Sequence, residues 1–283
     1  MLNLNDSKTL IMGILNATPD SFSGDGLDGN IKKALQQAQY FIEHGADILD
    51  IGGESTRPGA EFVASQDEID RVIPIILAIK AKFPDITISI DTYKSTVAES
   101  ALDAGADIIN DVWGGKMDPF ILDLSAKQNV PICLMHNRSE PKNTEMNIRL
   151  GGSYNAPNYV NFMEEILEEL HELARNAINA GVKSENIILD PGVGFGKTVE
   201  QNLALVNRLG DIKDLGFPVL LGTSRKSFIG HTLNTTAEDR LEGTLATTAL
   251  GIAGGADIVR VHDVKQNALV AKMTDAMIAQ MGE

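Results

Sequence analysis

The residues best suited to chemistry in this chain are polar side chains that close short apolar runs. Asp91, Asn110 and Asp190 each end such a run, and Lys226 closely follows another. An ionised carboxylate only accepts hydrogen bonds, whereas an amide both accepts and donates them. Two carboxylates and one amide around one site would complement a heterocycle edge with adjacent N–H and NH2 donors, as guanine-like and pterin rings carry. Lys226 could serve the acceptor atoms of the same ring.

Two plainer interpretations compete with a ligand site. A lone Asp after a strand is most often the N-cap of the next helix, and for any single residue of this set that interpretation would win. The other is a metal cluster, but hard metal ions favour several adjacent carboxylates, and here cationic residues lie between them. A ligand site is favoured if the fold brings the three side chains together.

Basic residues also stand near the ends of the apolar runs. The chain has a formal net charge of −15, which argues against binding to nucleic acid or to an anionic membrane surface. In so acidic a chain, a local group of basic residues indicates a site for an anionic ligand. The group comprises Arg57, Arg225, Lys226, Arg260 and His262. For Arg225, an ion pair with a neighbouring carboxylate is at least as good an interpretation.

The elements that must position these residues follow from eight apolar runs. Each run is rich in Ile, Val and Leu, as expected for strands that are buried on both faces. The runs are Leu10–Asn16, Asp47–Ile51, Ile86–Asp91, Ile108–Asp111, Pro131–His136, Ile187–Asp190, Pro218–Ser224 and Ile258–His262. Segments with a helical apolar period lie between them, for example Ile69 to Leu77 and Phe162 to Ala177.

A short repeat marks three of the passages from helix to strand. Gly45, Gly105 and Gly255 each begin the sequence Gly-Ala-Asp-Ile. Glycine suits the left-handed residue that ends a helix. A repeated unit with eight alternations of strand and helix indicates the α/β class, as a (β/α)8 barrel or a doubly wound sheet. Eight strands with polar residues at nearly every end favour the TIM barrel, as a single domain over residues 1–283.

In such a barrel the carboxyl ends of the strands share one rim, so residues far apart in the sequence should converge there. Those expected on the rim are Asn16, Glu54, Thr56, Arg57, Asp91, Asn110, His136, Asp190, Ser224, Lys226, Arg260 and His262. Segments 17–30 and 52–64 are longer than a strand-to-helix joint requires and are candidates for moving loops. The polar segment 137–158 is expected to be either a mobile flap or disordered.

Two other features limit the function. Asp190 opens a segment with glycines at 192, 194 and 196 that matches neither a P-loop nor a GxGxxG fingerprint, and we expect a loop whose backbone approaches a flat ligand. The single Cys133 lies inside an apolar run and is interpreted as a core residue. Because the chain contains no membrane-spanning stretch and its N-terminus no secretory signal, a cytoplasmic location is expected.

The ordered set of motifs resembles the dihydropteroate synthase family over essentially the whole chain. The motifs are Met12-Gly-Ile-Leu-Asn16, Asp50-Ile-Gly-Gly-Glu54-Ser-Thr56-Arg57-Pro58, Ser89-Ile-Asp91, Ile109-Asn110-Asp111, Leu134-Met-His136, Asp190-Pro-Gly-Val-Gly-Phe195, Gly222-Thr-Ser224-Arg-Lys226 and Arg260-Val-His262. The resemblance implies a (β/α)8 barrel that joins 6-hydroxymethyl-7,8-dihydropterin diphosphate to p-aminobenzoate and releases diphosphate, assisted by Mg2+. It also implies a homodimer built on the outer helices, and sulfonamides as p-aminobenzoate mimics.

The resemblance also assigns roles by position. It implies a pterin site made of Asp91, Asn110, Asp190 and Lys226, in agreement with the hydrogen-bonding argument. It implies a diphosphate site made of Asn16, Arg57, Arg260 and His262, with Asn16 also at the metal. It implies a p-aminobenzoate pocket lined by Thr56, Arg57, Pro58, Phe195, Ser224 and Lys226. Catalysis would fall to Asp91, Arg57, Lys226, Arg260 and His262, through a dissociative, carbocation-like displacement at the exocyclic carbon of the pterin.

Three positions depart from the family's usual pattern, and all flank the expected site. They are Gly24-Asp25 in the first loop, Asn137 after His136, and Val193. Two other functions stay open: a pterin-binding methyltransferase domain and a non-catalytic pterin-binding paralogue. The first has no need for Thr56-Arg57-Pro58 or for a diphosphate site. The intact set of basic residues argues against the second.

Overall fold

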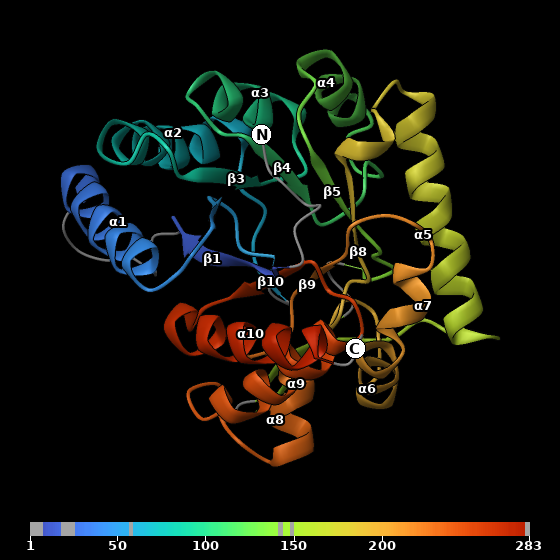
Figure 1. The fold of residues 1–283 in the computed structure, drawn as a ribbon. Helices are drawn as coiled ribbons and strands as arrows, with labels where there is room; N and C mark the ends of the chain where they lie inside the picture. Colours follow the sequence, from blue (N-terminus) through green and yellow to red (C-terminus); the bar gives the residue numbers. More distant parts are fainter. Residues whose placement is uncertain (1–7, 18–25, 57–58, 141–143, 148–149, 281–283) are drawn as a thin grey trace.

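The protein folds into a closed barrel of parallel strands with helices around it (Figure 1). The structure is a computed structural model that describes residues 8–17, 26–56, 59–140, 144–147 and 150–280. The strand order is β8-β5-β4-β3-β2-β1-β10-β9. A parallel bridge between Leu189 and Val219 joins the two ends of this order. The expected (β/α)8 class is therefore confirmed.

The barrel strands coincide closely with the eight apolar runs. They are β1 (Leu10–Asn16), β2 (Ile48–Gly52), β3 (Thr87–Asp91), β4 (Ile108–Asp111), β5 (Ile132–Met135), β8 (Ile187–Asp190), β9 (Leu220–Leu221) and β10 (Ile258–Val261). The largest difference is at β9, which forms only two ladder pairs with β10 and covers a small part of the predicted run.

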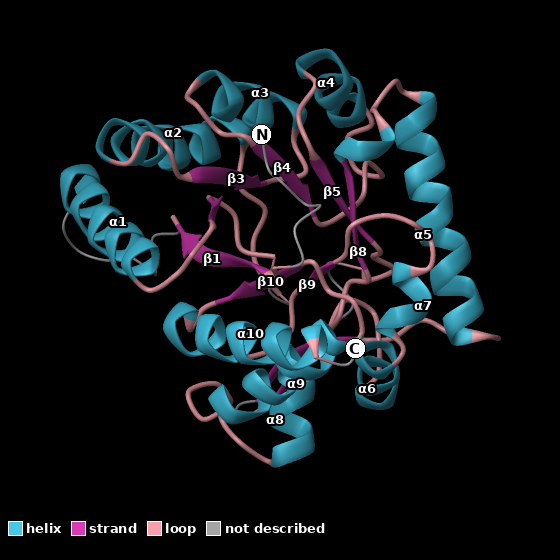
Figure 2. Cartoon of the chain, viewed as in Figure 1, coloured by secondary structure: helices cyan, strands magenta, loops and turns pink. Residues whose placement is uncertain are grey.

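The helices form the outer layer seen in Figure 2. They are α1 (Gly26–Glu43), α2 (Ser65–Lys82), α3 (Ser95–Asp103), α4 (Phe120–Gln128), α5 (Phe162–Asn179), α6 (Val199–Asn207), α7 (Leu209–Lys213), α8 (Ser227–Leu233), α9 (Leu241–Ala253) and α10 (Val264–Ala279). The two helices predicted from apolar period are α2 and α5. The predicted stripe of α5 is buried, including Leu170 and Leu173. On α2, Val72 and Ile76 are buried, but Leu77, predicted in the stripe, is 52% exposed, because the buried face passes through Ile79 instead.

The apolar core has two parts because successive strand residues point to opposite sides of the sheet. One part fills the barrel and takes a single residue from each of seven strands: Met12, Ile48, Ile108, Cys133, Ile188, Leu220 and Ile258. The larger part lies between the strands and the helices and includes Ile11, Leu49 and Ile90. Cys133 is a buried core residue, as predicted.

The Gly-Ala-Asp repeat forms the same joint three times at the amino ends of the strands. Gly45, Gly105 and Gly255 have φ of 97°, 108° and 97°, so the prediction of left-handed glycines is confirmed. In the third joint, Asp257 Oδ2 accepts the backbone N–H of Val219 at 2.7 Å, while the Asp257 N–H donates to the Val219 carbonyl at 2.9 Å. Asp47 and Asp107 make the same reciprocal bonds with Ile11 and Ile88.

The long polar segment after β5 contains structure that the sequence did not predict. A mobile flap or disorder was expected over 137–158. In the described part, β6 (Thr144–Asn147) pairs with β7 (Gly151–Tyr154) in an antiparallel hairpin, which contradicts disorder there, while the mobile flap stays a prediction. This hairpin is not part of the barrel. Over the whole described chain, no helix combines the length and apolar character that a bilayer crossing requires.

Candidate active site

The register of the sheet brings three predicted residues into one row at the carboxyl ends of the strands. Asn16 is the Cα partner of Gly52, Gly52 of Asp91, and Asp91 of Asn110. A Cβ on Gly52 would lie 3.3 Å from the Cβ of Asp91, so the glycine leaves room for that side chain. Asp190 lies at the same ends of the strands, as the last residue of β8. The predicted convergence of Asp91, Asn110 and Asp190 on one rim is thus present in the fold.

Arg260 of β10 is held between two buried carboxylates. Its Nε donates to Asp50 Oδ2 at 2.6 Å, and its Nη2 donates to Asp91 Oδ2 at 2.5 Å. Asn110 Nδ2 lies 3.3 Å from both carboxylate oxygens of Asp50. Asp50 is fully buried and was missing from the residues expected on the rim. Its signal in the sequence was a charged residue between Leu49 and Ile51, where an unpaired charge would be costly.

The carboxylate of Asp91 has one oxygen that nothing in the described protein satisfies. Burial raises the pKa of Asp91, Arg260 opposes this effect, and Asp50 adds to it. Arg260 itself stays charged, because Asp50 and Asp91 outweigh the lowering of its pKa by burial. Asp91 Oδ1 is buried and has no hydrogen-bond partner among the described residues. A buried acceptor of this kind is stabilised by a ligand that brings an N–H donor.

Asp190 and Lys226 approach the site from the other side of the barrel. Asp190 Oδ1 accepts the backbone N–H of Gly192 at 2.7 Å. Burial raises the pKa of Asp190, with Lys226 acting against it. Burial lowers the pKa of Lys226 to about 8, and Asp190 acts against that shift. The Lys226 ammonium donates to the Val193 carbonyl and lies 4.9 Å from the centre of the Phe195 ring.

The remaining described residues of the expected diphosphate and p-aminobenzoate sites also have defined contacts. Ser224 Oγ accepts the backbone N–H of His262 at 3.1 Å and lies 3.0 Å from His262 Nδ1. The carbonyl of Thr56 accepts a hydrogen bond at 2.9 Å from Tyr154, whose ring stacks on Phe195. Nothing in the sequence indicated Tyr154, because it lies in a polar segment without apolar period.

His136 follows β5 at the carboxyl end of the barrel, where it was expected, and it is fully buried against the glycine-rich loop. Lys197 Nζ lies 3.1 Å from His136 Nδ1, and Glu169 Oε2 lies 3.0 Å from His136 Nε2. Burial, followed by the charge of Lys197, lowers the pKa of His136 to about 4, so the ring is neutral at pH 7. Gly192 has a φ of 68°, and a Cβ there would lie 1.9 Å from the His136 carbonyl oxygen. His136 therefore supports the loop instead of facing a ligand.

Glu54, which was expected on the rim, and Arg225, which was named in the basic group, both form ion pairs. Glu54 Oε2 lies 2.6 Å from the ammonium of buried Lys94, which also contacts Glu68 at 2.6 Å. Arg225 binds Asp263 through two hydrogen bonds of 2.9 and 2.6 Å, so the ion-pair interpretation of Arg225 is confirmed. These pairs join residues of the rim to one another and stabilise the loops there.

Of the positions that depart from the family pattern, two are described. Asn137 is buried and donates to the Val112 carbonyl at 3.0 Å, and Val193 is fully buried. Arg57, Pro58, Gly24 and Asp25 lie outside the described residues.

Comparison with known proteins agrees with this geometry. The family model of pterin binding enzymes matches residues 12–262. A dihydropteroate synthase of Clostridium beijerinckii is 56% identical over 272 residues, which cover 96% of this chain and 95% of the relative. One of Bacillus subtilis is 52% identical over 97% of this chain and 90% of the relative.

Solved structures give the same answer. A dihydropteroate synthase of Clostridium difficile, crystallised in the presence of pteroic acid, superposes with a TM-score of 0.89 at 48% identity and covers 98% of this chain and 99% of that one. The enzyme of Yersinia pestis in a sulfonamide drug complex superposes with a TM-score of 0.87 at 39% identity, over 98% of this chain and 96% of that one. Sequence and fold therefore agree that the chain belongs to the pterin-binding enzymes and, within them, to the dihydropteroate synthases.

Proposed function

We propose that this protein transfers the pterinylmethyl group of 6-hydroxymethyl-7,8-dihydropterin diphosphate to p-aminobenzoate and releases diphosphate, with residues 1–283 as one pterin-binding domain. The observation that carries the proposal is Asp91 Oδ1, which is buried in the same row as Asn110 and has no hydrogen-bond partner in the part of the chain that the structure describes. A pterin edge offers N–H and NH2 donors to such an acceptor. Asp190 adds a second buried carboxylate.

The four residues of the proposed pterin site differ in the hydrogen bonds that they can form with the ring. Asp91 and Asp190 accept hydrogen bonds from the ring, and Asn110 can both accept and donate. Lys226 donates to the acceptor atoms of the ring and also contacts the ring of Phe195. We propose that Phe195, Thr56, Ser224, Arg57 and Pro58 line the p-aminobenzoate pocket.

The reaction is a displacement at the exocyclic carbon of the pterin. The C–O bond to diphosphate breaks and the leaving group keeps the electron pair. The lone pair of the neutral aromatic amine then forms the C–N bond, and the amine loses a proton. The ionised Asp91 would stabilise the positive charge that develops on the pterin, which favours a dissociative path.

Arg260, His262, Arg57 and Asn16 would hold the diphosphate. The two hydrogen bonds of Arg260 to Asp50 and Asp91 use two of the five N–H donors of a guanidinium. The same arginine can therefore bind an anion while it stays fixed by the two carboxylates. His262 is oriented by its contacts with Ser224.

The residues of the site fit an Mg2+ ion that would be held mainly by the substrate and only in part by the protein. Within the described residues, no group of three or more His, Cys, Asp or Glu side chains could hold a metal. Mg2+ is usually bound by one or two protein ligands together with phosphate oxygens and water. We propose that the amide oxygen of Asn16 supplies such a ligand. When bound, the ion would neutralise charge on the leaving diphosphate.

We further propose a homodimer through the outer helices. On α10, Leu269, Met273 and Met277 are 63%, 60% and 51% exposed and recur every four residues, so they form one apolar stripe. Exposed stripes of this kind mark protein interfaces. Met273→Asp should shift the sedimentation of the protein toward the monomer, whereas Lys272→Asp on the same helix should not. We also propose that the protein is cytoplasmic, as expected from the sequence.

The function is tested by mixing the protein with pterin diphosphate, p-aminobenzoate and Mg2+. We expect dihydropteroate and diphosphate to appear in equal amounts by mass spectrometry and a coupled diphosphate assay. Calorimetry with free pterin is the second arm. Pterin binding without any product would favour the non-catalytic paralogue, and methyl transfer from a methylated folate would favour the methyltransferase.

A further inference from the structure

The β6–β7 hairpin is attached to the barrel at its turn. Arg240 is 3% exposed and donates from Nη2 to the carbonyl of Leu150 at 2.8 Å. The same guanidinium donates from Nη1 to the carbonyl of Arg225 at 2.9 Å. The turn of the hairpin is therefore tied to the loop after β9, close in sequence to Ser224 and Lys226.

The other end of the hairpin carries Tyr154, which is 8% exposed. Its phenol donates to the carbonyl of Thr56 at 2.9 Å. Its ring stacks on Phe195 with a centroid separation of 5.8 Å and an angle of 24° between the rings. Burial raises the pKa of Tyr154 to about 12, so the phenol remains a donor at pH 7.

These two contacts of Tyr154 join opposite sides of the barrel. Thr56 follows β2 and Phe195 follows β8. In the closed strand order, β2 and β8 are four places apart in either direction. A side chain that touches the loops after both strands has to lie across the mouth of the barrel, over the carboxyl ends of the strands.

We propose that Tyr154 is a positioning residue for p-aminobenzoate, an inference that rests on the proposed function. The phenol fixes the loop that carries Thr56, and the ring fixes Phe195. Together these contacts set the width of the pocket in which the aromatic amine stacks. Asp91, Asn110 and Asp190 of the proposed pterin site stand at strand ends and are held by the barrel itself, so pterin binding should depend little on Tyr154.

Two substitutions separate the two contacts. Tyr154→Phe keeps the ring and removes only the hydrogen bond to Thr56, and we expect the KM for p-aminobenzoate to rise about 3- to 10-fold. Tyr154→Ala also removes the stacked ring, and we expect a rise of about 10- to 100-fold. In both variants the KM for pterin diphosphate and the affinity for free pterin should change less than about twofold. Tyr40→Phe, an exposed tyrosine on α1, is the matched control.

Hydrogen exchange of the segment 52–64 supplies a readout without turnover. Exchange there should be faster in Tyr154→Phe than in the wild type or in Tyr40→Phe. Equal losses for both substrates, or a wild-type KM for p-aminobenzoate in Tyr154→Ala, would overturn the role of Tyr154. Failure of the wild type to form dihydropteroate would instead overturn the proposed function, so the two failures are distinguishable.

Discussion

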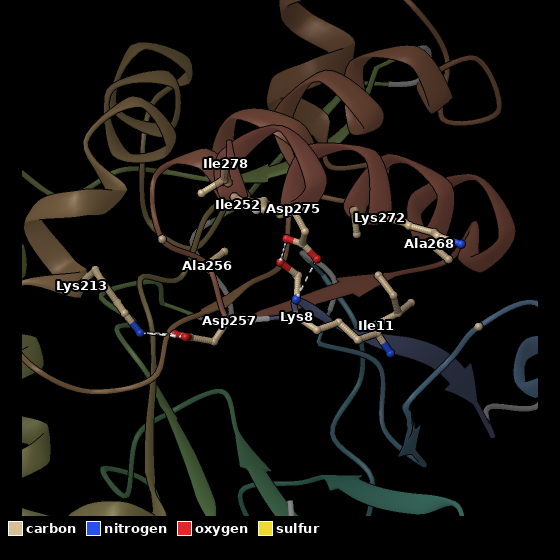
Figure 3. A pocket seen from close by; sticks show the side chains of 15 residues that line it. Lys8, Ile11, Lys213, Ile252, Ala256, Asp257, Ala268, Lys272, Asp275 and Ile278 are labelled. Atoms are coloured by element: carbon tan, nitrogen blue, oxygen red, sulfur yellow. Dashed lines mark hydrogen bonds and ion pairs between the residues drawn. The ribbon is translucent and has the colours of Figure 1, made fainter. Parts of the chain in front are cut away.

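The two ends of the barrel use charged residues in opposite ways. At the amino end, Asp47, Asp107 and Asp257 each bind a backbone N–H of a neighbouring strand and a lysine. The lysines are Lys8, Lys80 and Lys213, with ammonium to carboxylate distances of 2.6, 2.8 and 2.6 Å. Figure 3 shows the pair of Lys213 and Asp257 at the edge of a cavity of about 750 Å³. Beside this pair, Asp275 at the same cavity accepts hydrogen bonds from the backbone N–H and the hydroxyl of Thr9 at 3.0 and 2.8 Å.

At the carboxyl end, the charges around Asp91 are largely buried and incompletely matched. Asp50, Asp91 and Arg260 share one network, and one oxygen of Asp91 has no partner among the described residues. Burial raises the pKa of Asp91 and Asp190 and lowers that of Lys226. Such perturbed groups are expected where binding and catalysis occur, whereas the paired groups of the amino end are expected to contribute stability. The five predictions below test this division.

The largest effect is expected for Arg260→Ala. This change leaves Asp50 and Asp91 buried without their cation, which should lower the free energy of unfolding by ~3–5 kcal/mol. The loss of leaving-group stabilisation should lower kcat at least about 100-fold. Urea unfolding and steady-state kinetics measure the two effects. If the variant keeps wild-type kcat, Arg260 has only a structural role at this end of the barrel.

The acid sensitivity of the fold should come partly from His136, at the carboxyl end. The pKa of His136 is about 4 in the folded protein, whereas the ordinary value of 6.5 applies to the unfolded chain. Between pH 4 and 6.5 the folded state therefore binds fewer protons than the unfolded state. Stability should therefore fall as the pH drops from 6.5 to 4, by roughly 3 kcal/mol in total. His136→Gln should flatten this part of the pH profile in urea titrations. His171→Gln, at an exposed position of α5, should leave the profile unchanged.

Asp190→Asn tests the pterin edge with little change in shape. The variant replaces an acceptor by a group that also presents donors, which should cost ~1.5–3 kcal/mol of pterin binding, or about 10- to 100-fold in affinity. Calorimetry with free pterin measures the change, and circular dichroism checks the fold. Unchanged affinity in a folded variant would remove Asp190 from the site.

Asp257→Ala, at the amino end of the barrel, should lower stability and leave catalysis nearly unchanged. Without the carboxylate, the backbone N–H of Val219 loses its acceptor, and the free energy of unfolding should fall by ~1–3 kcal/mol. The kcat/KM at 25 °C should stay within about twofold of the wild type. Asp47→Ala and Asp107→Ala are matched repeats of the same experiment. A large loss of kcat/KM in all three would break the division between the two ends.

The smallest effect is expected for Lys213→Met. The Lys213 side chain is 40% exposed, so its pair with Asp257 is screened by solvent. The change should cost less than ~1 kcal/mol in thermal or urea unfolding. A cost as large as that of Asp257→Ala would mean that the ion pair, and not the backbone hydrogen bond, stabilises the joint.

Much of the site could be predicted because it depends on local sequence. Asp91, Asn110 and Asp190 stand at the ends of apolar runs, and parallel strands of a barrel bring those ends to one rim. The same reasoning located Cys133 in the core and the left-handed glycines at the joints. These features need only the period of the apolar residues and the conformational freedom of glycine.

Side-chain partners could not be predicted in the same way. Asp50 was missed, and the partners of His136 and Glu54 were not predicted, because each of the three is paired with residues far away in the sequence. Tyr154 contacts Thr56 across 98 positions of the chain. Which side chains meet depends on the strand order, on the register of the strands and on the path of the segment 137–158 after β5. Chain pattern alone thus determined the barrel and the row of polar residues at its carboxyl end, whereas tertiary packing decided which side chains pair with one another.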